Sequence, residues 1–317
     1  MFKLESFSKV IESPFFFPSI SSIRTNFKID EYLKLLMKIA YPGFLISAYD
    51  IDDYKDKEKL IKQLNEINQN SAFVLMDNGN YEAFWNQDNS WTFEKFEKIL
   101  KNAQIDLCFS YDIFWNDKKI TKHINETIKY TAMTGGVQHS GTTIPIIHGT
   151  PNNFPSLVKG VVEGINPEII GITERELGDS LIQRTETLFK IRKELIKIKR
   201  EIPIHLLGTG NPISILVYSL CGANFFDALE WCKNVVNPKT AHLYHFVQME
   251  LIECDCKVCN LKGLPYPVKV ISHNLLFYEK FLEEIRISIK KGKSEQLLKK
   301  YLPKHIIPKI KPFIITK

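Results

Sequence analysis

Short apolar runs alternate with longer amphipathic stretches along most of the chain from Gly43 onward. The short runs have the length and composition of buried strands, and the longer ones repeat apolar residues at helical spacing. Such alternation is typical of a parallel sheet or barrel. The expected strands are 44–48, 72–76, 106–110, 144–147, 168–172, 202–207 and 224–226, and the expected helices are 55–67, 92–103, 118–133, 180–200 and 212–221.

These alternating elements follow one another without an intervening linker, which favours a (β/α)8 TIM barrel over a doubly wound sheet. No glycine-rich dinucleotide-binding loop follows any expected strand. We therefore predict an α/β fold in which residues 1–317 form a single barrel domain. A closing helix is expected over 274–291.

Three cysteines and a histidine near the end of the barrel have the spacing Cys-x-Cys-x2-Cys-x13-His, formed by Cys254, Cys256, Cys259 and His273. Buried thiols or a disulfide would be an alternative, but a Cys-x-Cys pair is poorly placed to bond to itself. Three thiolates and one imidazole suit tetrahedral Zn2+, and four protein ligands leave no position for an activated water. The sequence therefore predicts a structural zinc site, in a zinc-binding subdomain at about 240–290 inserted near the C-terminal end of the barrel.

The charge and composition of the chain constrain its class only loosely. With 317 residues and 44% hydrophobic content, it can bury a large core, and its formal net charge is +6. Lysine and arginine gather late, over 192–200 and 290–304 and into a basic C-terminal tail at about 291–317. Such stretches suit a phosphate backbone, although most lysine-rich helical faces are simply solvated. The apolar run at Phe15–Phe17 is too short to span a membrane, so we expect a cytoplasmic protein without membrane contact.

Polar residues follow several expected strands directly, where barrel side chains face a common mouth. An aspartate at a strand end is more often a helix N-cap than a catalytic group. Asp77 precedes a glycine turn, however, and Asp227 lies among bulky residues, so one could serve as a base and the other as a nucleophile. The residues concerned are Asp77, Asp112, His148, Gly171, Gly208, Gly210 and Asp227.

These motifs together resemble the tRNA-guanine transglycosylases (queuine and archaeosine tRNA-ribosyltransferases), which exchange guanine for a 7-deazaguanine in nucleic acid. The similarity covers roughly residues 43–286 and includes the cysteine cluster, His273-Asn274-Leu275 and the stretch LLGTGNP…GANFFDALEWC. By this resemblance Asp227 is the nucleophile and Asp77 the general acid/base. It also implies base recognition by Asp112, by His148-Gly149 and by the turn at Gly171.

The chain departs from the bacterial tRNA enzymes at several positions. Asp77-Asn78-Gly79-Asn80-Tyr81-Glu82 stands where those enzymes read Asp-Ser-Gly-Gly-Phe-Gln, and His148 replaces a glutamine. The interval from Cys259 to His273 is also shorter. These features look more like the branch that inserts 7-deazaguanines into DNA. The alternatives are a tRNA-guanine transglycosylase, a non-catalytic accessory subunit and an unrelated zinc-containing barrel glycosidase.

The resemblance implies the partners as well. They are DNA or, in the alternative, tRNA, together with a free base such as 7-cyano-7-deazaguanine; a homodimer and accessory modification proteins are compatible with it. No other cofactor is expected. Aromatic residues could sandwich the base, although each is more often part of a core; the candidates are Tyr81, Phe84, Tyr111 and Trp115.

Overall fold

The computed structural model describes residues 1–6, 9–23, 25–70, 72–113 and 119–315. Its main sheet is a parallel barrel in the order β7-β6-β5-β4-β3-β11-β10-β9-β8. Both ends of this order meet at Pro145, which separates β7 from β8, so the barrel closes through the chain itself. The barrel strands are β3 (Phe15–Ile20), β4 (Gly43–Ser47), β5 (Phe73–Asp77), β6 (Leu107–Phe109), β7 (Thr142–Ile144), β8 (Ile146–Ile147), β9 (Ile170–Thr173), β10 (Ile204–Leu207) and β11 (Phe225–Ala228).

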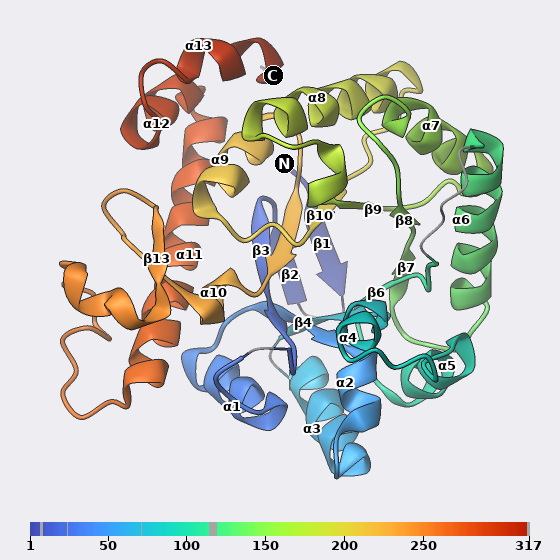
Figure 1. Ribbon diagram of the computed structural model, residues 1–317, viewed down its shortest axis with the longest axis horizontal. Helices are drawn as coiled ribbons and strands as arrows, with labels where there is room; N and C mark the ends of the chain where they lie inside the picture. Colours follow the sequence, from blue (N-terminus) through green and yellow to red (C-terminus); the bar gives the residue numbers. More distant parts are fainter. Residues whose placement is uncertain (7–8, 24, 71, 114–118, 316–317) are drawn as a thin grey trace.

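Helices surround these strands as an outer ring, which Figure 1 shows along the barrel. Each amphipathic helix packs its apolar stripe against the sheet; in α5, for example, Phe96, Ile99 and Leu100 are buried. The predicted α/β barrel is thus confirmed. The helices that connect barrel strands are α1 (Ile29–Ile39), α2 (Ala48–Asp53), α3 (Lys57–Asn70), α4 (Asn80–Trp85), α5 (Phe93–Asn102), α6 (Ile120–Gly135), α7 (Phe154–Ile165), η1 (Glu174–Leu177), α8 (Leu181–Lys197) and α9 (Pro212–Leu220).

The last barrel unit carries the inserted segment. After β11 the chain leaves the ring and then returns as the long helix α11, which contacts α9, α1 and β3 and so completes the ring. This helix begins at Tyr266 rather than at the predicted residue 274, because prolines are tolerated in a first helical turn. The elements after β11 are α10 (Glu230–Lys233), β12 (Asn234–Val236), β13 (Leu243–His245), η2 (Phe246–Leu251), α11 (Tyr266–Lys290), α12 (Ser294–Tyr301), α13 (Ile307–Ile310) and η3 (Lys311–Phe313).

The first barrel strand, β3, was not among the expected strands. Its sequence FFFPSI is apolar without alternation and contains Pro18, which cannot donate a ladder hydrogen bond. All six residues are buried, and β3 pairs in parallel with β11 and β4. An apolar run that could not be assigned from its pattern is therefore the strand that completes the barrel.

The N-terminal hairpin of β1 (Lys3–Ser6) and β2 (Lys9–Glu12) covers the end of the barrel where the strands begin. The ammonium group of Lys9 donates to the backbone oxygens of Asn68 and Ala72 at 2.7 and 3.2 Å and to the Asp106 carboxylate at 2.7 Å. Ala72 and Asp106 immediately precede β5 and β6. The opposite end, where the strands finish, stays open.

Candidate active site

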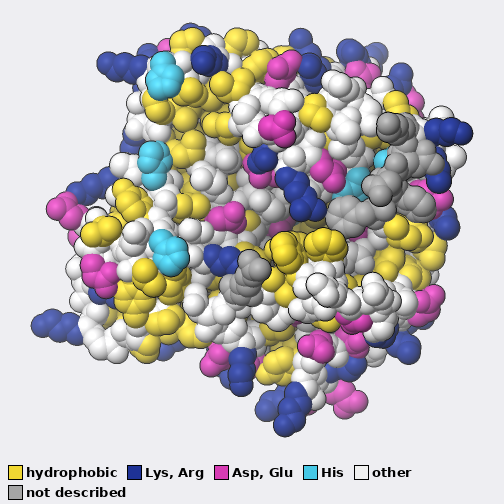
Figure 2. All heavy atoms as spheres, in the orientation of Figure 1, with side chains coloured by type: hydrophobic (Ala, Val, Ile, Leu, Met, Phe, Trp, Pro, Cys, Tyr) yellow, Lys and Arg dark blue, Asp and Glu magenta, His cyan; other side chains and the backbone are white. Residues whose placement is uncertain are grey.

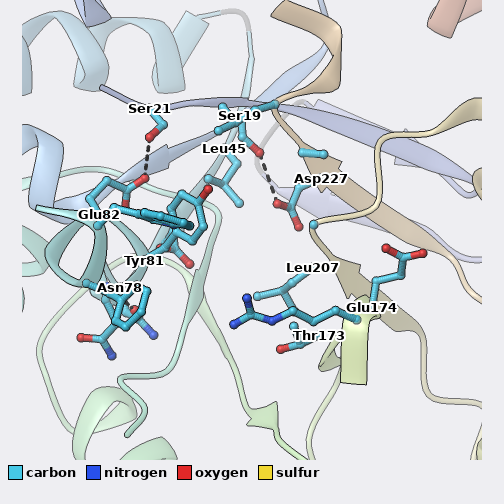
Figure 3. Close-up of a pocket in the computed structure, with 18 of the residues that line it drawn as sticks. Ser19, Ser21, Leu45, Asn78, Tyr81, Glu82, Thr173, Glu174, Leu207 and Asp227 are labelled. Atoms are coloured by element: carbon cyan, nitrogen blue, oxygen red, sulfur yellow. Dashed lines mark hydrogen bonds between the residues drawn. The ribbon is translucent and has the colours of Figure 1, made fainter. Parts of the chain in front are cut away.

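A cavity of about 650 Å³ opens at the carboxyl ends of the barrel strands. This size is within the range of small-molecule sites, and the position is where barrel enzymes place their chemistry. Four of the predicted polar residues come from four different strand ends and line this cavity: Asp77, Asp112, His148 and Asp227. Of the predicted glycines, Gly208 also lines the cavity, whereas Gly149, Gly171 and Gly210 are not part of its described lining. Figure 3 shows part of the wall, with Asp227 across the cavity from Tyr81 and Glu82.

Asp227 lies within β11 and is held by two donors. The Ser19 hydroxyl donates to its Oδ2 at 3.2 Å, and His205 Nε2 lies 2.8 Å from its Oδ1. A carboxylate only accepts hydrogen bonds, so the His205 proton must be on Nε2. Both bonds stabilise negative charge on Asp227 and fix its orientation. The side chain is therefore held in one orientation while it faces the cavity.

His205 was missed by the sequence analysis, although it belongs to an expected strand. Its side chain is fully buried inside the barrel, stacked on Phe17 at 5.8 Å and edge-on to Phe109 at 5.0 Å between ring centroids. Its Nδ1 has no hydrogen-bond partner among the described atoms. A lone imidazole at an inward-facing position of an otherwise apolar strand was the available signal. Its contact with Asp227 is what gives it a role.

Asp77 ends β5 in a different environment. Burial raises the pKa of its carboxyl to about 7, and the negative charges of Asp112 and Asp227 add to the effect, against a hydrogen bond from the Gly79 backbone. That amide donates to Asp77 Oδ2 at 3.1 Å. Gly79 has φ +88°, and a Cβ there would lie 2.7 Å from Tyr49, so only glycine allows this turn. Asp77 can therefore hold a proton at neutral pH when Asp227 is charged.

Asp112 and His148 form an ion pair on the same wall. His148 Nε2 lies 2.6 Å from Asp112 Oδ2, and its Nδ1 lies 2.8 Å from Glu176 Oε1. Burial alone would lower the pKa of His148, but its hydrogen bonds to Asp112 and Glu176 outweigh burial and raise it to about 10. Burial of Asp112 is likewise outweighed by the bond with His148, so its pKa is lowered. Both ring nitrogens of His148 are thus engaged by carboxylates, and the residue orients Asp112 in this arrangement.

Two asparagines from the turn after Asp77 complete the support of Asp112. The amide groups of Asn78 and Asn80 donate to Asp112 Oδ1 at 2.8 and 2.7 Å. The substitutions that distinguish this turn from Asp-Ser-Gly-Gly therefore have a structural use, because they supply donors for a carboxylate that follows the next strand, β6.

Glu82 is a further buried acid of the cavity wall. It is 3% exposed, and its carboxylate oxygens accept hydrogen bonds from Ser21 and Ser47 at 2.7 Å each. Burial raises its pKa to about 8, and the charges of Asp50 and Asp77 contribute in the same direction. A second carboxyl that can hold a proton at neutral pH thus lies near Asp77.

Only some of the predicted glycines and aromatic residues lie at the cavity. Gly149 donates its amide to Glu176 Oε2 at 3.0 Å, and a Cβ on Gly171 would meet the Phe109 ring at 3.0 Å inside the barrel. Tyr81 and Phe84 line the cavity, whereas Tyr111 packs against Phe93, Phe96 and Tyr130. Trp115 lies outside the described residues.

The predicted metal ligands converge at the start of α11. The sulfur atoms of Cys254, Cys256 and Cys259 lie 3.5, 3.7 and 3.4 Å from His273 Nδ1. A tetrahedral zinc with Zn–S near 2.3 Å and Zn–N near 2.0 Å separates sulfur from nitrogen by about 3.5 Å, so these distances fit the ion. His273 Nε2 donates to the Val236 carbonyl at 2.8 Å, which turns Nδ1 toward the thiols. The structure confirms a group of donors that fits structural zinc.

The late basic stretches do not face the cavity. Arg192 is buried and donates to backbone oxygens of Ile202 and Gly222, which lie where β10 and β11 begin. Lys290 pairs with Glu12 of the N-terminal hairpin at 3.1 Å. The cationic residues that do line the cavity are Arg175, Lys233 and His148.

Comparison with known proteins gives the same family as the motifs. No family model matches the chain. Over 310 residues it is 23% identical to a "tRNA-guanine(15) transglycosylase" of Nanoarchaeum equitans, covering 92% of this chain and 72% of the relative. The chain is thus similar to a protein titled as a tRNA-guanine transglycosylase. A "Queuine tRNA-ribosyltransferase" of Clostridium kluyveri is 27% identical over 143 residues, which is 38% of each chain.

No helix in the described ranges has the length and apolar character needed to cross a membrane.

Proposed function

We propose that this protein is a transglycosylase that exchanges guanine in nucleic acid for a free 7-deazaguanine base. The observation that carries the proposal is the pairing of two carboxyls in one cavity with opposite environments. Asp227 is held by hydrogen bonds with Ser19 and His205, whereas burial raises the pKa of Asp77 to about 7. A nucleophile and a proton donor need this separation of properties. The titles of the relatives named above are those of a transglycosylase and a tRNA-ribosyltransferase, which supports the same class of reaction.

In the first half-reaction the target guanosine unit is turned out of its stack into the cavity. Asp227 Oδ attacks C1′ of the sugar through an oxocarbenium-like transition state, while the C1′–N9 bond breaks and its electron pair goes to the base. Asp77, directly or through an oriented water, supplies the proton that the departing guanine requires. The product is a covalent ester between the sugar and Asp227.

In the second half-reaction a free 7-deazaguanine, such as 7-cyano-7-deazaguanine, enters the vacated space. Asp77, now a carboxylate, removes the proton from the ring nitrogen that attacks C1′. The bond between C1′ and Asp227 breaks, and its electron pair returns to the carboxylate. No hydride, phosphate or redox cofactor takes part, and the zinc site contributes to folding alone.

We assign recognition of the base edge to Asp112, which His148, Asn78 and Asn80 hold in place. Family resemblance extends this role to His148, Gly149 and the backbone near Gly171. Tyr81 from α4 and Leu207 from β10 face the same cavity (Figure 3) and offer an aromatic face and an aliphatic surface to a bound ring.

We propose DNA as the polymer, with tRNA as the competing substrate. The departures at Asn78, Asn80 and His148 and the short Cys259–His273 interval support the DNA branch, whereas the titles of both relatives name tRNA. A 2′-hydroxyl distinguishes the two polymers next to the reacting carbon, so direct competition separates them. The same proposal includes a homodimer and accessory modification proteins as partners. It also takes residues 1–317 as a single domain and places the protein in the cytoplasm.

The test is an exchange assay. Purified protein is incubated with radiolabelled guanine or 7-cyano-7-deazaguanine and, separately, with duplex DNA, single-stranded DNA and bulk tRNA, and acid-precipitable label is counted. Label in DNA that is absent with Asp227→Ala supports the DNA transglycosylase. Label in tRNA alone supports the competing substrate, and label in neither contradicts catalysis by this chain alone and leaves the accessory-subunit alternative.

A further inference from the structure

An exposed pair of aromatic rings lies beside the cavity. Phe84 and Trp85 end the short helix α4 and are 69% and 47% exposed, although both line the cavity wall. Their ring centroids are 5.7 Å apart at an interplanar angle of 79°, and Trp85 also contacts Tyr81 at 6.3 Å. Large aromatic side chains exposed together are costly in water, so they usually mark a contact surface.

The helix that carries these rings is firmly anchored. Between them and the start of α4, Glu82 is buried and accepts hydrogen bonds from Ser21 of the β3 end and Ser47 of the β4 end. At the N-terminal end, Asn80 donates to Asp112. The turn before α4 is fixed by Trp91, whose indole donates to the Asn78 carbonyl at 3.0 Å. The rings are therefore presented by a fixed support, which lowers the entropy lost when something stacks on them.

Two cationic side chains, Arg175 and Lys233, line the cavity beside carboxyls that include Glu174 and Glu230. Arg175 belongs to η1 and Lys233 ends α10, and Arg175 lies near enough to Tyr81 to act on it electrostatically. Figure 2 shows hydrophobic side chains near the centre of this face, next to lysine or arginine side chains. Aromatic faces that hold bases, combined with cations that hold phosphates, are the usual composition of a single-strand nucleic-acid site.

We propose that Phe84 and Trp85 form a stacking platform for the nucleobase next to the one that enters the cavity. The inference rests on the proposed function and specifies how its polymer is held. Extrusion of one base leaves its neighbour with one face unstacked, and the aromatic pair at the edge of the cavity replaces that lost partner. The contact is tolerant of sequence because every base has a flat face, and it is available to DNA and RNA alike.

The experiment couples a protein change to a substrate change. Fluorescence anisotropy is measured for fluorescein-labelled oligonucleotides with a single guanine, in three forms: intact, abasic on the 5′ side of the guanine, and abasic on the 3′ side. The proteins are the wild type, Phe84→Ala/Trp85→Ala, and Val10→Ala/Ile196→Ala. The last pair removes two side chains that are 57% and 59% exposed, away from the cavity lining.

The double variant is expected to weaken binding of the intact oligonucleotide by about 5- to 100-fold, whereas the control pair changes it less than twofold. For wild-type protein, one of the two abasic oligonucleotides should bind more weakly than the intact one by the same factor. For Phe84→Ala/Trp85→Ala, that abasic oligonucleotide should bind as well as the intact one, since both changes delete the same contact. Phe84→Tyr/Trp85→Tyr should restore most of the affinity, because the rings are retained.

Losses of affinity that add independently for the protein change and the abasic change would overturn the stacking platform. Unchanged oligonucleotide binding by Phe84→Ala/Trp85→Ala would also overturn it, and would point to a protein partner at this surface. These outcomes leave the proposed function intact if label exchange persists. Wild-type protein that binds none of the oligonucleotides and exchanges no label contradicts the proposed function itself.

Discussion

The zinc site and the cavity use the same kinds of polar side chain but are assembled differently. The metal ligands come from one stretch and the first turns of the helix after it, so their sequence spacing already determines their geometry. The cavity collects single residues from the ends of many strands, separated by up to the whole barrel. A local site can be recognised from spacing, whereas a distributed site is defined only by the fold. Mutations in the zinc site should therefore lower stability, whereas mutations in the cavity should lower activity with little effect on stability.

The largest effect is expected for Cys256→Ser, which removes one zinc ligand. Such sites contribute folding free energy directly, so the variant should lose about one zinc per chain and several kcal/mol of stability. Metal analysis and denaturant unfolding measure both. Asp255→Asn changes an exposed neighbour between two ligands and should leave zinc content unchanged. A variant that is stable without metal would contradict a structural role for the ion.

Asp77→Asn should have the reverse effect, with full stability and little activity. Removal of a positioned general acid/base lowers kcat by about 10²- to 10⁴-fold. Because burial raises the pKa of Asp77 to about 7, the wild-type rate of guanine release should also fall as the pH rises through 7, when the donor proton is lost. Single-turnover release of guanine between pH 5.5 and 9 measures this. A release rate that stays level across that range would remove Asp77 as the donor.

A smaller effect is expected for His205→Phe, which keeps the packing between aromatic rings but cannot donate to Asp227. A misaimed nucleophile should lower kcat by about 10- to 100-fold with KM little changed. His205→Gln can still donate and should recover part of the rate. A variant that loses stability but keeps kcat would show that the histidine has only a packing role.

The smallest effect is a change in how stability depends on pH. Glu82 has a native pKa of about 8, raised by burial from 4.5, so between these values the native state holds a proton that the unfolded state has lost. The free energy of unfolding should therefore fall as the pH rises through this window. Glu82→Gln should reduce that fall by about 1 kcal/mol or more, compared with the exposed control Glu58→Gln. Urea unfolding at pH 5 and pH 8.5 gives the comparison; equal slopes for both variants and wild type would place Glu82 in a solvated setting.

Much of the fold could be predicted because the barrel repeats one local pattern. The strands that carry Asp77 and Asp227 were recognisable from their apolar runs, and the residues after them pointed to the cavity. Phe15–Ile20 was missed because its apolar run does not alternate and Pro18 argues against a strand. His205 was missed because its partner is 22 residues away, on the neighbouring strand. Such pairings depend on strand register, which a single sequence does not display.

For the basic stretches, the sequence suggested a binding role that their position in the fold does not support. Their charge suggested a grip on phosphates, but the fold places Arg192 and Lys290 at the closed end of the barrel, where they bond to backbone oxygens and to Glu12. Net charge along a sequence carries no information about which end of a barrel it reaches.

The most direct test of the central claim is to trap the bond between Asp227 and the sugar. Wild-type protein, Asp227→Ala and the matched control Asp56→Asn are each mixed in excess with end-labelled guanine-containing DNA or RNA, quenched in denaturant and separated on a denaturing gel. The account predicts a slow band with wild type and Asp56→Asn, no such band with Asp227→Ala, and a peptide map that places the nucleotide on Asp227. An adduct of equal intensity with Asp227→Ala would move the nucleophile to another residue and contradict the account.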